Sequence, residues 1–242
     1  EGQIDALPIC NPMAFNAETR FTPFNDRDMA RAFTTDPPKD LTEALSHAIL
    51  RFADKAEFIF NLHSAGDARY LPHIIFYRQE DADRVAKMGF PFAIKRGTPE
   101  TLLHHIASHM RSDQLTVTLE LGGGTVAFHD EVDQGVQLIL ANLGQLGILP
   151  SVKNVVEPTP MDHIWLVDNR EFVRAPSEGA FYTHAMLGTH FTKGQTLGYW
   201  IGLEDYQPRL IFAPLDGKLV YLRTRNRVPS GETLAMFLPP QE

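Results

Sequence analysis

The chain has 242 residues, enough for one large domain or two of ordinary size, and 43% of them are hydrophobic. Its formal net charge is −8, and the 22 basic residues form no stripe, which argues against nucleic acid or an anionic membrane surface as a partner. The single cysteine allows no internal disulfide, and no apolar run is long enough to span a membrane, so we expect a protein of the reducing cytoplasm.

The N-terminal region combines an apolar run with a long polar loop. The chain begins at Glu1 rather than Met and enters the strand-like run Ile4–Ile9 at once, which predicts that it starts inside a longer protein. In the loop that follows, Arg20 and Arg31 lie among aromatic residues and prolines. Arginine suits a carboxylate through paired hydrogen bonds, but ordinary salt bridges within the loop would explain the same pattern.

The rest of the first 150 residues alternates between helical periodicity and short apolar runs. Asp40 and Glu43 form a capping box at the start of the first helix, and Gly144 is placed to cap the end of the last one. Strands alternating with helices predict a mostly parallel sheet covered by helices. The expected helices are 41–52, 98–110 and 132–143, and the expected strands are 57–63, 73–77 and 114–121.

Two of the expected strands end in side chains that can do chemistry. His63 closes an apolar strand and precedes a turn, and Glu120 closes another before three glycines. The carboxyl ends of strands face the crevice where α/β proteins bind ligands, and a buried carboxylate needs a metal or a cation nearby. The alternatives are a satisfied histidine and an exposed glutamate on an edge strand. We interpret His104, His105 and His109 as the surface of a helix.

The character of the sequence changes near residue 150, where prolines predict a linker. Beyond it a repeat is visible, because the segment 175–179 (Ala-Pro-Ser-Glu-Gly) matches 213–217 (Ala-Pro-Leu-Asp-Gly), and 193–197 matches 230–234. Each half reads as short strands separated by turns at glycine. We therefore predict an α/β domain over 1–150 and a small all-β barrel-sandwich domain with internal two-fold symmetry over 160–242.

Four short motifs follow one another in the chain. They are Asn11-Pro-Met-Ala-Phe15 with Arg20 downstream, Asp28-Met-Ala-Arg31-Ala-Phe33, Asn61-Leu-His63 and Glu120-Leu-Gly122. In order and approximate spacing they resemble the succinylglutamate desuccinylase/aspartoacylase family, relatives of the zinc carboxypeptidases. The C-terminal repeat resembles the β domain of bacterial members, so the resemblance covers nearly the whole chain.

The resemblance implies a zinc-dependent hydrolase that cleaves the amide bond of a small N-acyl amino acid or N-acyl amine. It implies one zinc ion with His63 as a ligand, Glu120 as the general base and Arg20 as the group that stabilises the developing oxyanion. Arg31 would hold a substrate carboxylate, with Asn11 as a further substrate-binding residue. The resemblance is also compatible with a homo-oligomer.

The sequence departs from the family pattern at three places. No histidine is followed three residues later by Glu or Asp, so the leading His-x-x-Glu motif is absent, and two further zinc ligands are expected from an upstream segment. The same upstream segment should add strands to the sheet, so the α/β domain is expected to be incomplete at its N-terminus. Ala30 and Asn61 stand where the family has Asn and Asp, which removes one hydrogen bond to a substrate carboxylate and makes the metal environment less negative.

Three functions remain open at this point. The first is the zinc-dependent deacylase. The alternative is a non-catalytic descendant of the same family that binds a small ligand or a partner, which Ala30 and Asn61 favour. The third treats the β domain as a carrier module, although the repeat junction shows no lysine-bearing hairpin.

Overall fold

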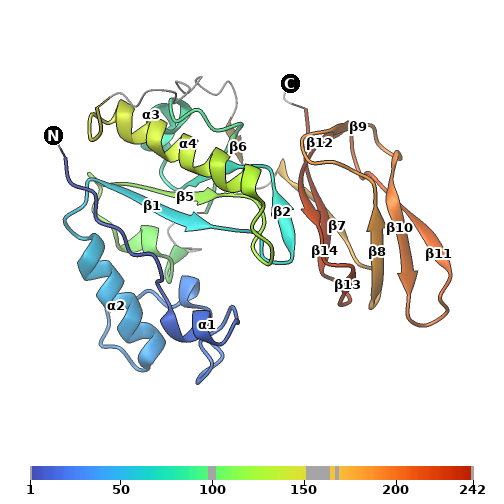
Figure 1. Cartoon of the computed structure of the whole chain (residues 1–242), viewed down its shortest axis with the longest axis horizontal. Coiled ribbons are helices and arrows are strands. Elements are labelled where there is room, and N and C mark those ends of the chain that lie inside the picture. The colour runs from blue at the N-terminus through green and yellow to red at the C-terminus, as the bar shows by residue number, and fades with distance from the viewer. Residues whose placement is uncertain (1, 98–101, 151–163, 167–168, 241–242) are drawn as a thin grey trace.

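The computed structural model describes residues 2–97, 102–150, 164–166 and 169–240 (Figure 1). An α/β part built on one mixed sheet lies beside an all-β part built on two antiparallel sheets. Helices α2 (Leu41–Ala53) and α4 (His129–Gln145) lie on opposite sides of the mixed sheet. The predicted α/β class is therefore confirmed.

Within the described residues, the mixed sheet has five strands in the order β1-β5-β3-β4-β6. Their bounds are β1 Phe58–His63, β3 His73–Phe76, β4 Ala93–Lys95, β5 Leu115–Glu120 and β6 Ile164–Leu166. Three of the four neighbouring pairs are parallel, and only β3 and β5 run antiparallel. The two strands that carry the candidate site residues, β1 and β5, are parallel neighbours and end at the same edge.

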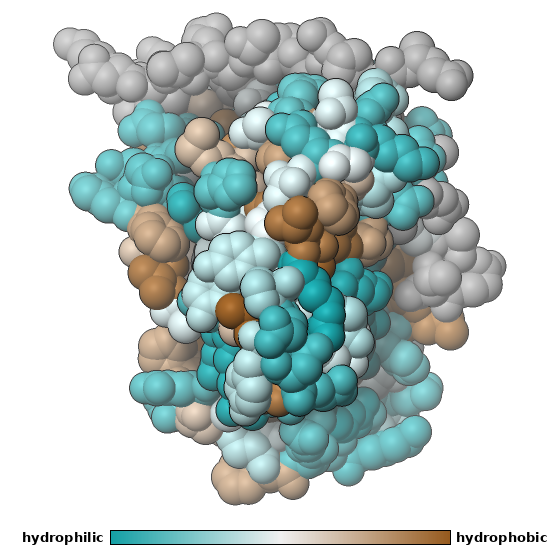
Figure 2. Space-filling view, turned by 90° about the vertical axis from the view of Figure 1, so that its right-hand side faces the viewer, coloured by the Kyte–Doolittle hydropathy of each residue, from teal (hydrophilic) through white to brown (hydrophobic). Residues whose placement is uncertain are grey.

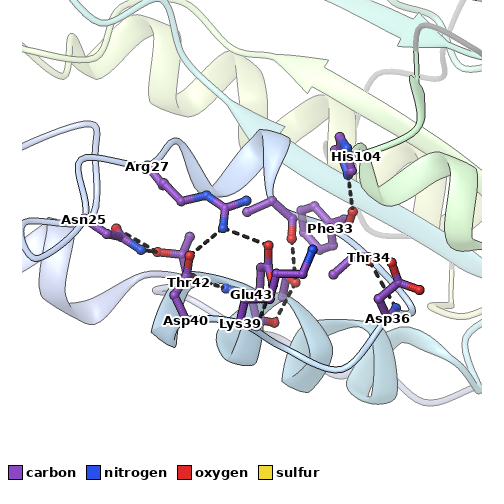
Figure 3. Close-up of polar contacts among 12 residues, drawn as sticks. Asn25, Arg27, Phe33, Thr34, Asp36, Lys39, Asp40, Thr42, Glu43 and His104 are labelled. Carbon is purple, nitrogen blue, oxygen red and sulfur yellow. Dashed lines mark hydrogen bonds and ion pairs between the residues drawn. The ribbon is translucent and has the colours of Figure 1, made fainter.

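The first helix of the predicted set begins as the sequence indicates. The Asp40 side chain accepts a hydrogen bond from the Glu43 N–H (3.0 Å), which caps α2. The Glu43 carboxylate accepts from the Lys39 N–H (2.7 Å) and from Arg27 (2.8 Å), instead of closing the box on Asp40. Figure 3 shows this polar cluster, which fixes the preceding loop to the start of α2. The other helices are α1 Pro12–Asn16, η1 Met29–Arg31, η2 Gln79–Asp81, α3 Ala82–Ala86 and η4 Ile106–His109.

Three local predictions are wrong. The run Ile4–Ile9 is not a strand, since no described strand pairs with it, and Ile4 is 51% exposed. Within the helix predicted over 98–110, the described residues 102–110 form turns and η4. Gly144 lies inside α4, and Gly147, with φ +69°, is the left-handed residue after the helix, where its N–H bonds to the Gly144 carbonyl (3.0 Å).

The two faces of the mixed sheet differ in polarity. Leu115, Val117 and Leu119 of β5 point into the apolar core that also includes residues of α3 and α4. The alternate residues of β5 are polar, and Thr118 and Glu120 are buried beneath the loops of the opposite side. Alternation along one buried strand thus places the hydrophobic core and the candidate site on opposite faces of the same sheet.

The all-β part consists of a four-stranded sheet, β11-β10-β8-β13, facing the sheet β2-β12-β14-β7, to which β9 is joined through β12. Buried Trp200, Phe181, Leu197 and Phe237 belong to the core between them. The described strands form no closed barrel. Their bounds are β2 Ala68–Tyr70, β7 Glu171–Arg174, β8 Gly179–Thr183, β9 His190–Phe191, β10 Thr196–Gly202, β11 Pro208–Phe212, β12 Gly217–Arg223, β13 Arg227–Val228 and β14 Thr233–Leu238.

The sequence repeat corresponds to a reciprocal pattern of backbone hydrogen bonds. The Ala175 carbonyl accepts from the Gly231 N–H (2.9 Å), and the Ala213 carbonyl accepts from the Gly194 N–H (2.9 Å). Each alanine of one repeat thus bonds to the glycine turn of the other, and both alanines are 3% exposed. This exchange supports the predicted internal two-fold symmetry.

No pattern in the sequence predicts the pairing of β2, from the α/β part, with β12. Asp67, just before β2, accepts hydrogen bonds from Arg223 (3.4 Å) and Arg225 (3.1 Å). Arg223 is the last residue of β12, and Arg225 lies two residues beyond it. The division into domains 1–150 and 160–242 stays a prediction, and most of the predicted linker lies outside the described residues.

The outer face of the four-stranded sheet carries exposed apolar side chains. Figure 2 looks at this side of the molecule and shows hydrophobic groups among hydrophilic ones. Tyr199, Leu210 and Phe212 are 41%, 59% and 46% exposed. A solvated antiparallel sheet ordinarily has a polar outer face, so this surface is unusual. None of the helices in the described residues is both long and apolar enough to cross a membrane.

Two glycines of the same helix end should respond oppositely to alanine. Gly144→Ala should raise the free energy of unfolding by about 0.5–1 kcal/mol, because the position is helical and an added Cβ meets no atom within 4 Å. Gly147→Ala should lower it by about 1 kcal/mol, because φ +69° is strained for alanine. Urea unfolding of both variants measures the difference, and a change of the same sign in both would contradict the assignment of the helix end.

Candidate active site

His63 and Glu120 end the parallel strands β1 and β5 in direct register. The structure brings these two predicted residues together, with His63 Nδ1 3.9 Å from Glu120 Oε1. The side chain of His63 is 33% exposed and that of Glu120 is 9% exposed. The imidazole therefore lies at the mouth of the site and the carboxylate beneath it.

The carboxylate of Glu120 is buried, and the described residues do not fully satisfy its hydrogen-bonding capacity. Its Oε2 atom has no hydrogen-bond partner among the described residues. Burial raises the pKa of Glu120 to about 7, and the positive charges of Arg96, Arg20 and Arg170 oppose that rise. A carboxyl group with such a pKa can both accept and release a proton near neutral pH.

The environment of His63 favours the neutral imidazole. Burial lowers its pKa, as does the charge of Arg20, while Asp28 acts in the opposite direction. A neutral imidazole has a lone pair that can bind a metal ion. The described residues hold no group of three His, Cys, Asp or Glu side chains placed to bind a metal. A neutral imidazole beside a carboxylate oxygen without a partner in the described ranges fits one ligand and the base of a zinc site. A zinc ion held here would need further ligands from outside those ranges.

The loops after β1 and β5 pack against each other. The Ala65 N–H donates to the Gly122 carbonyl (3.1 Å), and Gly122 has φ +81°. A Cβ on Gly124 would lie 2.7 Å from Ser64 Oγ, so this position needs glycine. The glycines after Glu120 thus permit close contact between the two loops that border the site.

Arg20 and Arg31 share one carboxylate. Asp28 Oδ2 accepts from Arg20 Nε (3.2 Å) and Nη2 (2.8 Å) and lies 3.8 Å from Arg31 Nε. The other oxygen of Asp28 caps η1 by accepting from the Ala30 N–H (3.0 Å). The arginine side chains are 69% and 73% exposed, whereas Asp28 is 15% exposed. One carboxylate therefore contacts both arginines to which the resemblance assigns roles toward the substrate.

Asn11 makes structural hydrogen bonds in the same loop region. Its Oδ1 accepts from the Ala14 N–H (3.1 Å) as the cap of α1, and its Nδ2 donates to Thr22 Oγ1 (2.9 Å). These bonds use both ends of the amide, and a role of Asn11 in binding substrate stays a prediction.

Sequence reasoning missed several neighbours of the pair. Tyr77 Oη lies 2.6 Å from Thr118 Oγ1 and 3.3 Å from His105 Nε2, and Asn61 Nδ2 donates to Thr118 Oγ1 (3.4 Å). Thr118 could have been found, because it precedes Glu120 by two residues and so shares its face. His105 could not be found in this way. Its placement on a helix surface is wrong, because it is half-buried and caps the short helix η4. Burial lowers its pKa to about 4.

An apolar hollow of about 440 Å³ lies away from this site. Phe58, Phe60, Met88, Leu115 and Leu146 are among the residues that line it. Phe58, Phe60 and Leu115 belong to the helix-covered face of β1 and β5. The hollow therefore opens on the opposite side of the sheet from Glu120, and the polar site is the better candidate for chemistry.

The fold and the site define an α/β protein with a neutral imidazole and a buried carboxylate at the ends of adjacent parallel strands. The model of the succinylglutamate desuccinylase/aspartoacylase catalytic domain matches residues 1–145. The chain belongs to this family, as the four motifs indicated.

Individual relatives are similar at low identity over almost the whole chain. The N-alpha-acetyl-L-2,4-diaminobutyric acid deacetylase of Halomonas elongata is 23% identical, over 98% of this chain and 72% of the relative. Among solved structures, a succinylglutamate desuccinylase/aspartoacylase from Rhodobacter sphaeroides has a TM-score of 0.77 at 21% identity, covering 98% of this chain and 74% of that one. The product-bound ectoine utilization protein EutE (DoeB) from Ruegeria pomeroyi has a TM-score of 0.78 at 19% identity, covering 97% and 74%.

The burial of Glu120 should make stability depend on pH. Its pKa rises from an ordinary 4.5 to about 7 in the folded protein, so the stability this group contributes is present below pH 4.5 and lost as pH rises through 7. Glu120→Gln removes the ionisation. Between pH 4.5 and 8 the metal-free variant should therefore gain up to about 3 kcal/mol in unfolding free energy relative to wild type.

Urea unfolding of chelator-treated protein at both pH values measures this difference. Glu80→Gln is the matched control, since the Glu80 side chain is 68% exposed. Parallel pH dependence of wild type and Glu120→Gln would contradict a desolvated Glu120.

Proposed function

We propose that the protein is a zinc-dependent deacylase that hydrolyses the amide bond of a small N-acyl amino acid or N-acyl amine. The observation that carries the proposal is the buried carboxylate of Glu120, which lies 3.9 Å from His63 and whose Oε2 has no hydrogen-bond partner within the described part of the chain. Membership of the family supports it, as does the deacetylase named among the relatives. The products would be a carboxylic acid and a free amine.

Glu120 would act first as a base and then as an acid. In its ionised form it takes a proton from the attacking water, whose oxygen forms the new bond to the amide carbon. It then delivers that proton to the leaving nitrogen as the C–N bond breaks. A pKa near 7 suits both steps, because neither protonation state is strongly disfavoured at neutral pH.

The arginines would bind the negative charge of the substrate and stabilise that of the transition state. Arg20, whose charge acts on both Glu120 and His63, would stabilise the oxygen that becomes negative during attack. Arg31, held beside it by Asp28, would bind a substrate carboxylate. His63 would be one ligand of a zinc ion, which when bound supplies a Lewis acid and lowers the pKa of a bound water. The remaining ligands, a homo-oligomer and a cytoplasmic location stay predictions.

The alternative is a non-catalytic member of the family that binds a small ligand or a partner. Ala30 and Asn61 favour it, because Asn61 bonds to Thr118 instead of placing a negative charge near His63. This alternative expects Glu120→Ala to leave the biological role intact.

Hydrolysis by the purified full-length protein separates the two functions. A panel of N-acetyl and N-succinyl amino acids and N-acetylated diamines is incubated with zinc-loaded protein, and the released amine is measured. Glu120→Gln should lower kcat by at least about 10²-fold, because it cannot accept the proton, while exposed Glu80→Gln should not change it. Chelation should abolish the activity and zinc should restore it. No hydrolysis by wild type, or full activity in Glu120→Gln, would refute the proposal.

A further inference from the structure

Two adjacent histidines, His104 and His105, attach to different parts of the site. The Phe33 N–H donates to the His104 carbonyl (3.2 Å), and His104 Nδ1 lies 3.2 Å from the Phe33 carbonyl oxygen. A carbonyl can only accept, so His104 Nδ1 carries the hydrogen. His104 therefore binds both backbone polar groups of Phe33. Figure 3 shows the contact between the His104 ring and the Phe33 carbonyl.

Phe33 in turn closes the segment that carries the substrate-facing arginines. It lies two residues after Arg31, whose short helix is capped by Asp28. The Phe33 side chain is 5% exposed and packs with Ile106 of η4. We call residues 20–33 the arginine loop. Hydrogen bonds to His104 and packing against Ile106 thus fix the C-terminal end of this loop.

His105 attaches to the sheet on the other side. Its Nδ1 accepts from the Ala107 N–H (3.2 Å), so in the neutral ring the hydrogen is on Nε2. Nε2 can then donate to Tyr77 Oη (3.3 Å), over which the ring is tilted at a centroid distance of 4.8 Å. Tyr77 Oη lies 2.6 Å from Thr118 Oγ1, where either hydroxyl can be the donor. The hydrogen bonds thus connect the loop to strand β5.

The chain of hydrogen bonds ends beneath the candidate pair. Thr118 precedes Glu120 by two residues on β5, and Asn61, which also donates to Thr118, precedes His63 by two on β1. Residues two apart in a strand share a face. The network therefore includes Thr118 and Asn61, which are the neighbours of Glu120 and His63 on the same face of the sheet.

We infer that His104 and His105 form a histidine bridge that positions the arginine loop relative to the strand bearing Glu120. The inference rests on the proposed function, since it assigns the bridge the task of aligning a substrate held at one end with the base at the other. This connection sets the distance between Glu120 and Arg31, which binds the substrate carboxylate. The amide carbon of a substrate held by Arg31 therefore lies within reach of Glu120 only while the connection is intact.

The contacts argue against two simpler roles. Metal binding does not suit His105, because both ring nitrogens take part in hydrogen bonds within the chain. Filling a hydrophobic core does not suit His104, which is exposed. His104 and His105, with Tyr77, are positioning residues and not catalytic ones.

Comparison of two substrates tests the bridge in the zinc-loaded full-length protein. One is the best N-acyl amino acid, and the other is the same compound with its carboxylate converted to a primary amide. His105→Leu and Tyr77→Phe should each lower kcat for the acid by about 10-fold or more, with little change for the amide, which does not engage Arg31. His105→Gln keeps a side-chain N–H and should recover most of the rate. Tyr182→Phe, at an exposed tyrosine of β8, is the matched control.

The outcomes separate the bridge from a general structural role. An equal loss for both substrates, or no loss for either, would overturn the inference. If wild type hydrolyses neither substrate, the proposed function fails, and amide hydrogen exchange still tests the connection. Tyr77→Phe should then speed exchange at the Phe33 N–H several-fold although residue 77 does not touch it, and unchanged exchange there would overturn the bridge.

Discussion

The buried carboxylate of Glu120 is the constraint on which the arrangement of this protein depends. A desolvated carboxylate is costly, and the fold offsets part of that cost with arginine charges from three separate segments. Arg20 comes from the N-terminal loop, Arg96 follows β4, and Arg170 precedes β7. The loops and the β part are therefore tied electrostatically to one side chain at the end of β5.

The β part contacts the α/β part directly through strand pairing and ion pairs near the site. Strand β2 extends a sheet of the β part, and Asp67 pairs with Arg223 and Arg225. The loop between β1 and β2 is thus anchored at one end by His63 and at the other by the second sheet. The pairing of β2 with β12 crosses the predicted division at residue 150, which stays a prediction.

Local patterns predicted that His63 and Glu120 lie close together, but they did not predict the segments around them. His63 and Glu120 were recognisable because each closes an apolar strand, and strand ends of parallel neighbours meet. The segment containing His104 and His105 was mistaken for a helix because its apolar residues have helical spacing. Its histidine side chains bond to backbone groups instead, and their partners, Phe33 and Tyr77, are distant in sequence. Such contacts leave no periodic signal.

The repeat shows the opposite case, in which sequence similarity alone was sufficient. Ala175 and Ala213 are equivalent because the carbonyl of each accepts a hydrogen bond from the glycine turn of the other repeat. The glycine that follows α4 is Gly147, three residues beyond the predicted Gly144. Both are glycines, and only the backbone conformation separates them.

The environment of Glu120 is tested most directly by titrating its carboxyl carbon by ¹³C NMR in metal-free protein, with the signal assigned by its absence in Glu120→Gln. A pKa near 7 is expected, because the carboxylate is buried and its Oε2 has no hydrogen-bond partner in the described ranges. A pKa near the ordinary 4.5 would show a solvated carboxylate and would contradict the burial of Glu120.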